Sequence, residues 1–149
     1  MKQNISAIKY PKKIVIYSND KTDSGLWIAS CNALIIDNLI SNYDLGKYVL
    51  EFLSKSKHNL PHPINWKEFT KKYLLSVGFK SNSALMINAM CVSIGQDDNE
   101  IVFMPSKNGG TKGNQRGFYY LEEKKITVSI SKNFEYLGAK LNESWKLCI

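Results

Sequence analysis

A Leu-Gly pair that occurs twice constrains the fold of this chain more than any other feature of its sequence. Leu45-Gly46 lies in Asn42-Tyr-Asp-Leu-Gly-Lys-Tyr-Val-Leu, and Leu137-Gly138 lies in Asn133-Phe-Glu-Tyr-Leu-Gly-Ala-Lys-Leu. Each pair falls near the start of an amphipathic helical pattern that follows a strand-like run. Glycine inside a helix costs about 1 kcal/mol relative to alanine, so each glycine indicates a close approach to another element. The pattern predicts two similar helices packed on one sheet, and chance similarity is the alternative.

The two predicted helices carry apolar side chains at helical spacing. The C-terminal helix has the stripe Phe134, Leu137, Leu141 and Trp145. The first helix is expected to begin at Ser41, because Ser41 and Asp44 have the spacing of a capping box. Its predicted buried stripe comprises Leu45, Val49, Phe52 and Leu53.

A third helix is predicted between Asn65 and Gly78. Asn65 can cap its start, with Glu68 three residues on, and Gly78 is a natural stop. The expected stripe of this helix comprises Trp66, Phe69, Tyr73 and Val77. Beyond it, Ser81 or Ser83 can start a short helical turn.

Apolar runs between the helices predict strands. Residues 12–17 and 26–37 are two such runs, the second with a break near Cys31-Asn32. Residues 91–94 and 101–104 flank a polar tip and predict a hairpin. Residues 118–121 and 126–130 flank the charged residues 122–125 and predict another hairpin, because apolar and polar side chains alternate after residue 125.

The order of these elements defines the expected fold class. Strands joined by hairpins pair antiparallel, and the predicted helices need a sheet face to cover. We therefore predict an α+β fold with an antiparallel or mixed twisted β-sheet and two to four helices packed on it. No linker or low-complexity tract divides the chain, so a single domain spanning residues 1–149 is expected.

The net charge of +7 comes almost entirely from lysine. Nineteen of the twenty basic residues are lysines, and Arg116 is the only arginine. Lysine suits diffuse attraction to anions, whereas arginine is preferred for forked recognition of phosphates and bases. Three interpretations stay open: a basic face that meets an acidic protein partner, a nucleic-acid-binding surface, or scattered solvated lysines.

The cysteines and the hydropathy of the chain indicate a cytoplasmic protein. Cys31, Cys91 and Cys148 lie far apart and form no metal-binding or disulfide pattern. No run of residues approaches the length of a membrane span, and the N-terminus does not resemble a signal peptide. We expect reduced thiols, no membrane association and a cytoplasmic location.

The sequence offers no pattern of catalytic or cofactor-binding residues. His58 and His62 are spaced for a metal, but the prolines of Leu60-Pro-His-Pro break the helix that would align their rings. The glycine-rich residues 107–117 contain four of the nine glycines and lack the spacing of a phosphate-binding loop. We expect a mobile loop there, no metal, no cofactor and no enzymatic activity.

Several short stretches, taken in order, give a resemblance to a known family. They are Asn42-Tyr-Asp-Leu-Gly, Ser54-Lys-Ser, Trp66, Val77-Gly-Phe-Lys-Ser, residues 89–94, residues 101–105, Gly117-Phe118 and Leu137-Gly138. Across residues 25–149 the chain resembles the immunity proteins of contact-dependent growth inhibition systems. The resemblance implies a cytoplasmic, non-catalytic protein that binds the toxic C-terminal domain of a delivered effector, often a nuclease and in some cases one acting on transfer RNA.

The basic charge departs from this resemblance, because immunity proteins against nucleases are often acidic. If the partner is a toxin, the expected contacts are Lys107, Lys112 and Arg116 on the glycine-rich loop, with Tyr119 and Tyr120 as anchors. Ordinary sheet packing is the alternative role for the two tyrosines. A small basic nucleic-acid-binding module is the alternative function.

Overall fold

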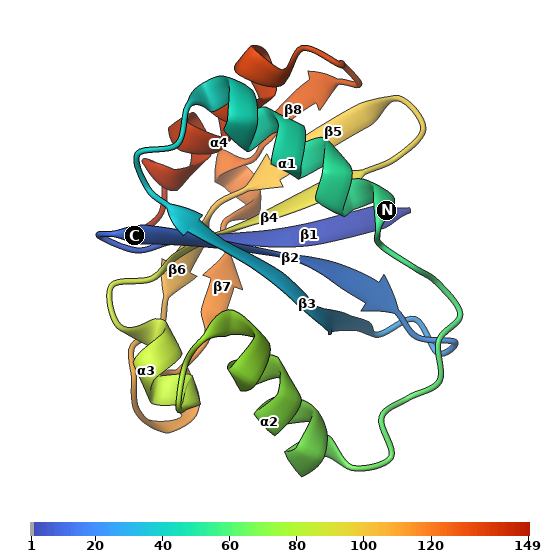
Figure 1. Cartoon of the computed structure of the whole chain (residues 1–149), viewed down its shortest axis with the longest axis vertical. Coiled ribbons are helices and arrows are strands. Elements are labelled where there is room, and N and C mark those ends of the chain that lie inside the picture. Colours follow the sequence, from blue (N-terminus) through green and yellow to red (C-terminus); the bar gives the residue numbers. More distant parts are fainter. Residues whose placement is uncertain (1) are drawn as a thin grey trace.

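A central antiparallel sheet with helices on both faces organises the structure, a computed structural model that describes residues 2–149 (Figure 1). The strands are β1 (Gln3–Lys9), β2 (Lys13–Lys21), β3 (Trp27–Asp37), β4 (Met90–Gln96), β5 (Glu100–Met104), β6 (Ser106–Asn108), β7 (Phe118–Tyr120) and β8 (Ile126–Ser129). The helices are α1 (Asn42–Ser54), α2 (Trp66–Val77), α3 (Asn82–Met86) and α4 (Phe134–Trp145), with single 3-10 turns η1 (Gly113–Gln115) and η2 (Glu122–Lys124). This arrangement confirms the predicted α+β class.

The six-stranded sheet has the order β3-β2-β1-β4-β5-β8, and every neighbouring pair is antiparallel. The predicted hairpin of β4 and β5 is confirmed. The N-terminal strand β1, to which the sequence analysis assigned no element, lies at the centre of the sheet between β2 and β4.

The predicted hairpin of residues 118–121 with 126–130 is wrong. β7 pairs with β6 in a separate two-stranded sheet, and β8 pairs with β5 at the edge of the large sheet. The η2 turn separates the two strands. Pairing with β5 places Val128 opposite Ile101 and buries both side chains in the core, which pairing with the half-exposed β7 would not achieve.

The structure confirms the helix caps, the helix end and the strand break that the sequence predicted. The side chains of Ser41, Asn65 and Ser81 accept hydrogen bonds from backbone N–H groups three residues on, at 3.1 Å each. Gly78 ends α2 in the left-handed conformation with φ of 80°. The break expected near Cys31-Asn32 is a bulge in the pairing of β3 with β2. Cys31 lies in this bulge and has a φ of 62°.

The core lies between the sheet and the helices α1 and α4. It contains the apolar side chains that alternate along β1, β2, β4 and β5, together with the predicted stripe of α1 and, from that of α4, Leu137, Leu141 and Trp145. Phe134, the first residue of the predicted α4 stripe, packs on Tyr43 instead. Leu45, Leu137 and Leu141 are fully buried there, and the Trp145 indole donates a hydrogen bond to the Ala7 carbonyl at 3.1 Å. Burial of these side chains supplies most of the hydrophobic stabilisation of the fold.

The two Leu-Gly helices touch through their glycines. A Cβ built on Gly46 would lie 1.8 Å from the carbonyl oxygen of Phe134, and one built on Gly138 would lie 1.9 Å from that of Asn42. Each glycine therefore faces the first residue of the other helix. The contact is reciprocal, and Asn142 Nδ2 donates to Asn42 Oδ1 at 2.6 Å beside it. The close approach predicted from the two glycines is confirmed.

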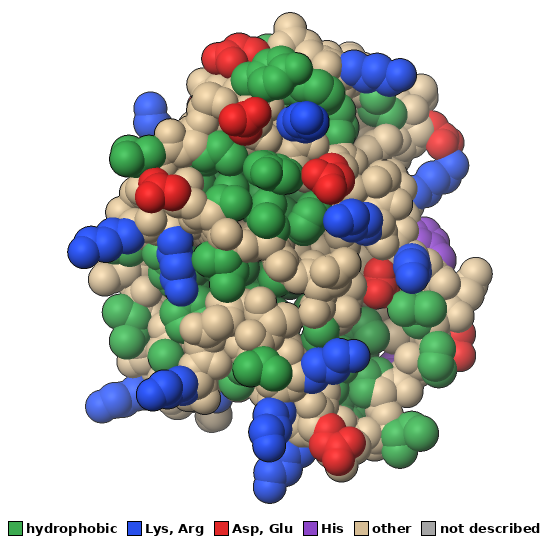
Figure 2. Space-filling model, viewed as in Figure 1, with side chains coloured by type: hydrophobic (Ala, Val, Ile, Leu, Met, Phe, Trp, Pro, Cys, Tyr) green, Lys and Arg blue, Asp and Glu red, His purple; other side chains and the backbone are tan. Residues whose placement is uncertain are grey.

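Helices α2 and α3 and the β6–β7 sheet lie on the other side of the large sheet (Figure 1). A smaller cluster there contains Ile8, Val15, Val77, Leu85 and Met86. In the same orientation, lysine and arginine side chains are spread over the space-filling view, including its bottom and lower left, where this second layer lies (Figure 2). Among residues 2–149, no helix has the length and apolar character needed to cross a bilayer.

A Gly46→Ala substitution tests the reciprocal contact, because the contact decides whether the substitution raises or lowers the free energy of unfolding. Alanine favours an isolated helix by about 1 kcal/mol over glycine, so an unconstrained position would gain stability. At Gly46 the new Cβ meets backbone that cannot rotate away, and we expect a lower midpoint of urea unfolding. Lys47→Ala, at the exposed neighbouring position, is the control and should leave the midpoint nearly unchanged. A stabilised Gly46→Ala variant would contradict the close approach.

Candidate functional site

The sheet face opposite α1 and α4 changes from apolar to polar along its strands. On β1, Ile8 points to this face near one end, as does Tyr10 directly after the strand, and Asn4 and Ser6 point to it near the other end. On β2 the series Val15, Tyr17 and Asn19 runs the same way. Helices α2 and α3 cover the apolar half only. The polar half therefore forms the floor of an open groove.

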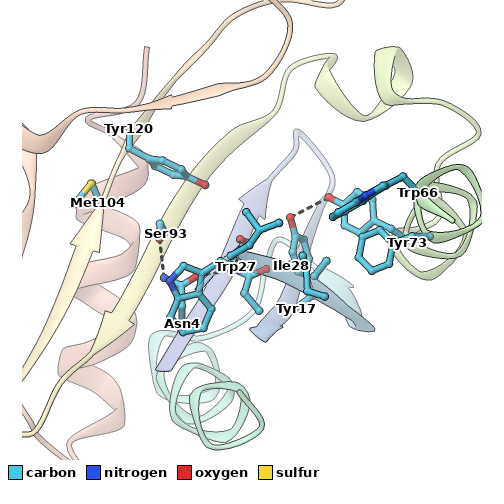
Figure 3. A pocket seen from close by; sticks show the side chains of 14 residues that line it. Asn4, Tyr17, Trp27, Ile28, Trp66, Tyr73, Ser93, Met104 and Tyr120 are labelled. Carbon is cyan, nitrogen blue, oxygen red and sulfur yellow. Dashed lines mark hydrogen bonds between the residues drawn. The ribbon is translucent and has the colours of Figure 1, made fainter. Parts of the chain in front are cut away.

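The groove has a volume of about 610 Å³, within the range of sites that hold a ligand or a partner's side chain. Trp66, Phe69 and Tyr73 of α2 stand on one side of it. Tyr120 of β7 stands on the other side, and Trp27 of β3 lies between them near the floor (Figure 3).

Hydrogen bonds fix the floor of the groove. Asn19 Nδ2 donates to Asn4 Oδ1 at 2.6 Å and to Ser6 Oγ at 3.0 Å. Asn4 Nδ2 in turn donates to Ser93 Oγ on β4 at 3.0 Å. The network joins three adjacent strands and contains no charged side chain. It gives the groove a rigid polar surface with little rotational freedom left to lose on binding.

The aromatic walls are also ordered by contacts with one another. The hydroxyl groups of Tyr17 and Tyr73 lie 2.9 Å apart, and their rings pack edge to face. Trp66 packs edge to face on Phe69 with ring centroids 5.6 Å apart. The Lys21 ammonium lies 5.4 Å from the centroid of the Trp27 ring. These contacts hold large apolar surfaces at the mouth of the groove.

Burial keeps the hydroxyl and thiol groups beneath the groove neutral. Burial raises the pKa of Tyr17 and of Tyr73 above the ordinary value of 10.0, and for Tyr73 the neighbouring Tyr17 adds to the rise. Burial also raises the pKa of the Cys91 thiol to about 12. These groups are therefore protonated at neutral pH, and Cys91 does not have the thiolate character of a reactive cysteine.

The five predicted partner contacts all lie in or beside the β6–β7 hairpin. Lys107 pairs with Tyr119 across the two strands, and Lys112 and Arg116 are exposed in the connecting loop. Tyr119 and Tyr120 are 48% and 46% exposed, so part of each side chain is accessible to a partner. Because successive strand residues point to opposite faces, Tyr120 alone reaches the groove.

The glycine-rich loop between these strands has structure of its own. Gly109 N donates to the Gly117 carbonyl at 2.8 Å, and the Ser83 hydroxyl donates to the Thr111 carbonyl at 2.8 Å. Arg116 Nη1 donates to Ser83 Oγ at 3.2 Å, and the Tyr119 hydroxyl donates to the Gln115 carbonyl at 3.0 Å. The loop is thereby attached to α3, next to the groove.

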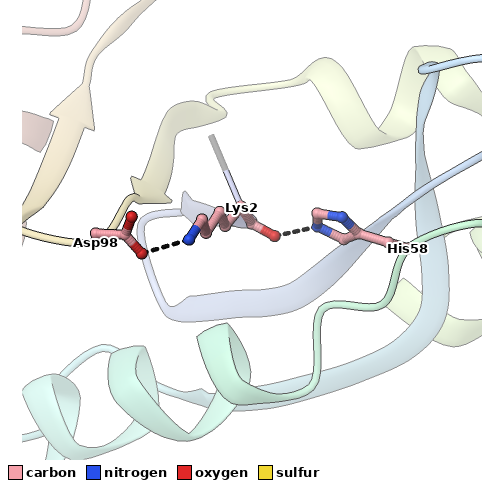
Figure 4. A network of polar contacts seen from close by, with 3 residues as sticks. All are labelled: Lys2, His58 and Asp98. Carbon is pink, nitrogen blue, oxygen red and sulfur yellow. Dashed lines mark hydrogen bonds and ion pairs between the residues drawn. The ribbon is translucent and has the colours of Figure 1, made fainter.

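The two histidines make different local contacts. The His58 ring meets the backbone carbonyl of Lys2, whose ammonium pairs with Asp98 (Figure 4). The His62 ring meets the Ser24 hydroxyl instead. Within residues 2–149, no three side chains of the metal-ligating types His, Cys, Asp and Glu come together as a possible metal site.

Sequence reasoning missed the groove itself. It predicted Trp66, Phe69 and Tyr73 as the buried stripe of α2, but Trp66 is 48% exposed and only Val77 of that stripe is buried. The helix reaches past the apolar half of the sheet, so its first turns face the groove. One signal in the sequence could have indicated the groove. Asn4 and Ser6 alternate with the apolar Ile5 and Ala7, which is the pattern of a strand with one polar face.

An open groove with a rigid uncharged floor and aromatic walls, on a small α+β fold, defines a protein built to hold a partner. The family model described as CdiI, the CDI immunity protein, matches residues 3–148. The chain therefore belongs to this family, the immunity proteins of contact-dependent growth inhibition. No curated protein matches the sequence.

Two solved structures share the fold at low sequence identity. A protein of unknown function from Neisseria meningitidis is 17% identical, with a TM-score of 0.77 over 99% of this chain and 95% of that one. A chain from the CdiA-CT/CdiI toxin and immunity complex of Yersinia pseudotuberculosis is 16% identical, with a TM-score of 0.74 over 99% of this chain and 97% of that one. Both likenesses extend over the whole fold.

The Tyr17–Tyr73 pair predicts a loss of stability in alkaline solution. Because the pKa of Tyr73 is raised in the folded state, the neutral hydroxyl stabilises the fold fully below pH 10.0, and this contribution falls as the pH rises toward the folded pKa. Tyr73→Phe removes the ionisable group, so its melting temperature should fall less between about pH 10 and about pH 11.5 than that of the parent. Tyr136→Phe, at an exposed tyrosine, is the control. Identical pH profiles for all three proteins would contradict the prediction.

Proposed function

We propose that this chain binds the toxic C-terminal domain of a cognate CdiA effector in the cytoplasm and neutralises it without catalysis. The observation that carries the proposal is the family match over residues 3–148. The fold shared with a chain of the Yersinia pseudotuberculosis toxin and immunity complex supports it. The groove and the hairpin beside it provide a surface on which a folded partner can dock.

The toxin is proposed to be a nuclease, with transfer RNA as one substrate class, as the resemblance to this group of immunity proteins implies. The basic net charge bears on how such a toxin would be inhibited. A chain with a charge of +7 does not imitate the phosphates of a nucleic acid. Inhibition would therefore work by covering the active site or the face on which the substrate docks.

The toxin-contacting residues are proposed to include Lys107, Lys112, Arg116, Tyr119 and Tyr120. All five lie at the surface of one hairpin and its loop. Aromatic anchors surrounded by charged side chains are common at the centre of protein interfaces. Tyr120, which forms a wall of the groove, is the anchor with the deepest position.

Co-expression in bacteria tests this function. Cells that express the toxin domain encoded beside this chain should die, and cells that also express this chain should survive, because the complex blocks the toxin. The specificity control is an unrelated nuclease toxin, which should still kill.

Two outcomes would count against the function. Failure to protect against the neighbouring toxin would contradict it directly. Protection against every nuclease tried, together with strong binding of generic RNA that collapses between low and moderate salt, would favour a basic nucleic-acid-binding module instead.

A further inference from the structure

The positive charge of this chain is concentrated on one side of the large sheet. The layer formed by residues 61–89 and 105–121 holds a single acid, Glu68, and seven basic residues: Lys67, Lys71, Lys72, Lys80, Lys107, Lys112 and Arg116. Its net charge is +6. The remaining residues carry thirteen basic and twelve acidic side chains, a net charge of +1. The excess of positive charge is therefore concentrated in this layer, which favours the interpretation of a basic face over that of evenly scattered lysines.

Arg116 of this layer donates a hydrogen bond to Ser83, and none of the seven cations takes part in the ion pairs found among residues 2–149. All seven are exposed. The ion pairs found among residues 2–149 join other side chains: Lys2 with Asp98, Lys55 with Glu51, Lys125 with Glu122 and Lys140 with Glu143. Seven exposed like charges on one layer repel one another. An anionic partner would relieve that repulsion.

The groove lies between this basic layer and the large sheet, and it presents apolar surface to solvent. Trp66 and Leu26 at its mouth are 48% and 44% exposed, and Tyr120 is 46% exposed. A second hollow adjoins it and shares Ile28 and Phe69 with it, and both Lys72 and the layer's single acid, Glu68, line this hollow. Apolar surface surrounded by lysine is the usual arrangement of a buried interface centre with a charged rim.

Building on the proposed function, we infer that this basic layer is the toxin-docking surface and that its occupant is an acidic segment of the toxin. An apolar side chain of that segment enters the groove between Trp66 and Tyr120. Aspartate and glutamate side chains flanking it meet Lys71 and Lys72 of α2. The uncharged floor accommodates the backbone or an amide of the segment through Asn4, Asn19 and Ser93.

Protein carboxylates fit this surface better than a nucleic acid does. Six of its seven cations are lysines, which attract anions without the forked geometry that phosphates and bases favour. Two of the aromatic rings at the groove, Tyr17 and Tyr73, are held edge to face by each other rather than presented as stacking platforms. A nucleic acid as the occupant is the outcome that the experiment below must exclude.

The test compares two double charge reversals that change the net charge equally. Lys71→Glu with Lys72→Glu alters exposed positions on α2, and Lys47→Glu with Lys132→Glu alters exposed positions on the α1 and α4 side. The association rate of each with the purified toxin domain encoded beside this chain is measured at low and at moderate salt. We expect the α2 variant to associate about tenfold more slowly or worse at low salt, and the control pair to stay close to the parent.

The groove is tested through dissociation. Tyr120→Ala removes the wall of the groove and should increase the dissociation rate about tenfold or more, because the buried centre of an interface sets that rate. Tyr43→Ala, at a tyrosine 51% exposed on α1, is the matched control and should not change it. Thermal melts identify any variant that fails to fold.

The outcomes separate this inference from the proposed function. If the parent chain binds the toxin and both charge reversals behave alike, or Tyr120→Ala dissociates as the parent does, the docking surface is wrong and the function stands. If the parent does not bind the toxin, the function fails and the inference with it. If the parent binds a transfer RNA tightly at moderate salt and the α2 variant does not, the inference that the occupant is an acidic protein segment is wrong.

Discussion

The fold depends on the contact in which each of two helices presents a glycine to the first residue of the other. With Gly46 against the Phe134 carbonyl and Gly138 against the Asn42 carbonyl, α1 and α4 approach as closely as backbones can. This closeness lets the apolar stripes of both helices reach the same face of the sheet, where they bury Leu45, Leu137 and Leu141. A single methyl group at either glycine would separate the helices and open that core.

Because α1 and α4 complete the core on one face, the other face is free for a different task. Helices α2 and α3 bury only its apolar half, and the hydrogen-bonded Asn4, Asn19 and Ser93 remain at the base of a groove. The charge follows the same division, with +6 of the +7 on the groove side. The proposed docking surface and the main core thus lie on opposite faces of the sheet, so the docking surface can vary in sequence without disturbing that core.

Much of the fold could be predicted because its signals are local. Cap residues such as Ser41 and Asn65, the stop at Gly78 and the break near Cys31 each act within a few residues, and all four are confirmed. Strand partners are set by packing between distant segments, which explains why β8 was assigned to the wrong neighbour. The groove was missed for the same reason. Its floor and walls come from six strands and one helix, and no single stretch of the sequence shows that these elements meet. The five predicted contacts remain a proposal.

Hydrogen–deuterium exchange on the free chain and on its complex with the neighbouring toxin domain tests the division between the two faces most directly. The account predicts that the toxin slows exchange in residues 66–77 and 106–120, the parts of the basic layer that lie beside the groove. Exchange in residues 42–54 and 134–145, the two glycine-linked helices, should stay as slow as in the free chain, because they hold the core and do not meet the toxin. Slowing confined to α1 and α4, with the groove side unchanged, would contradict the account.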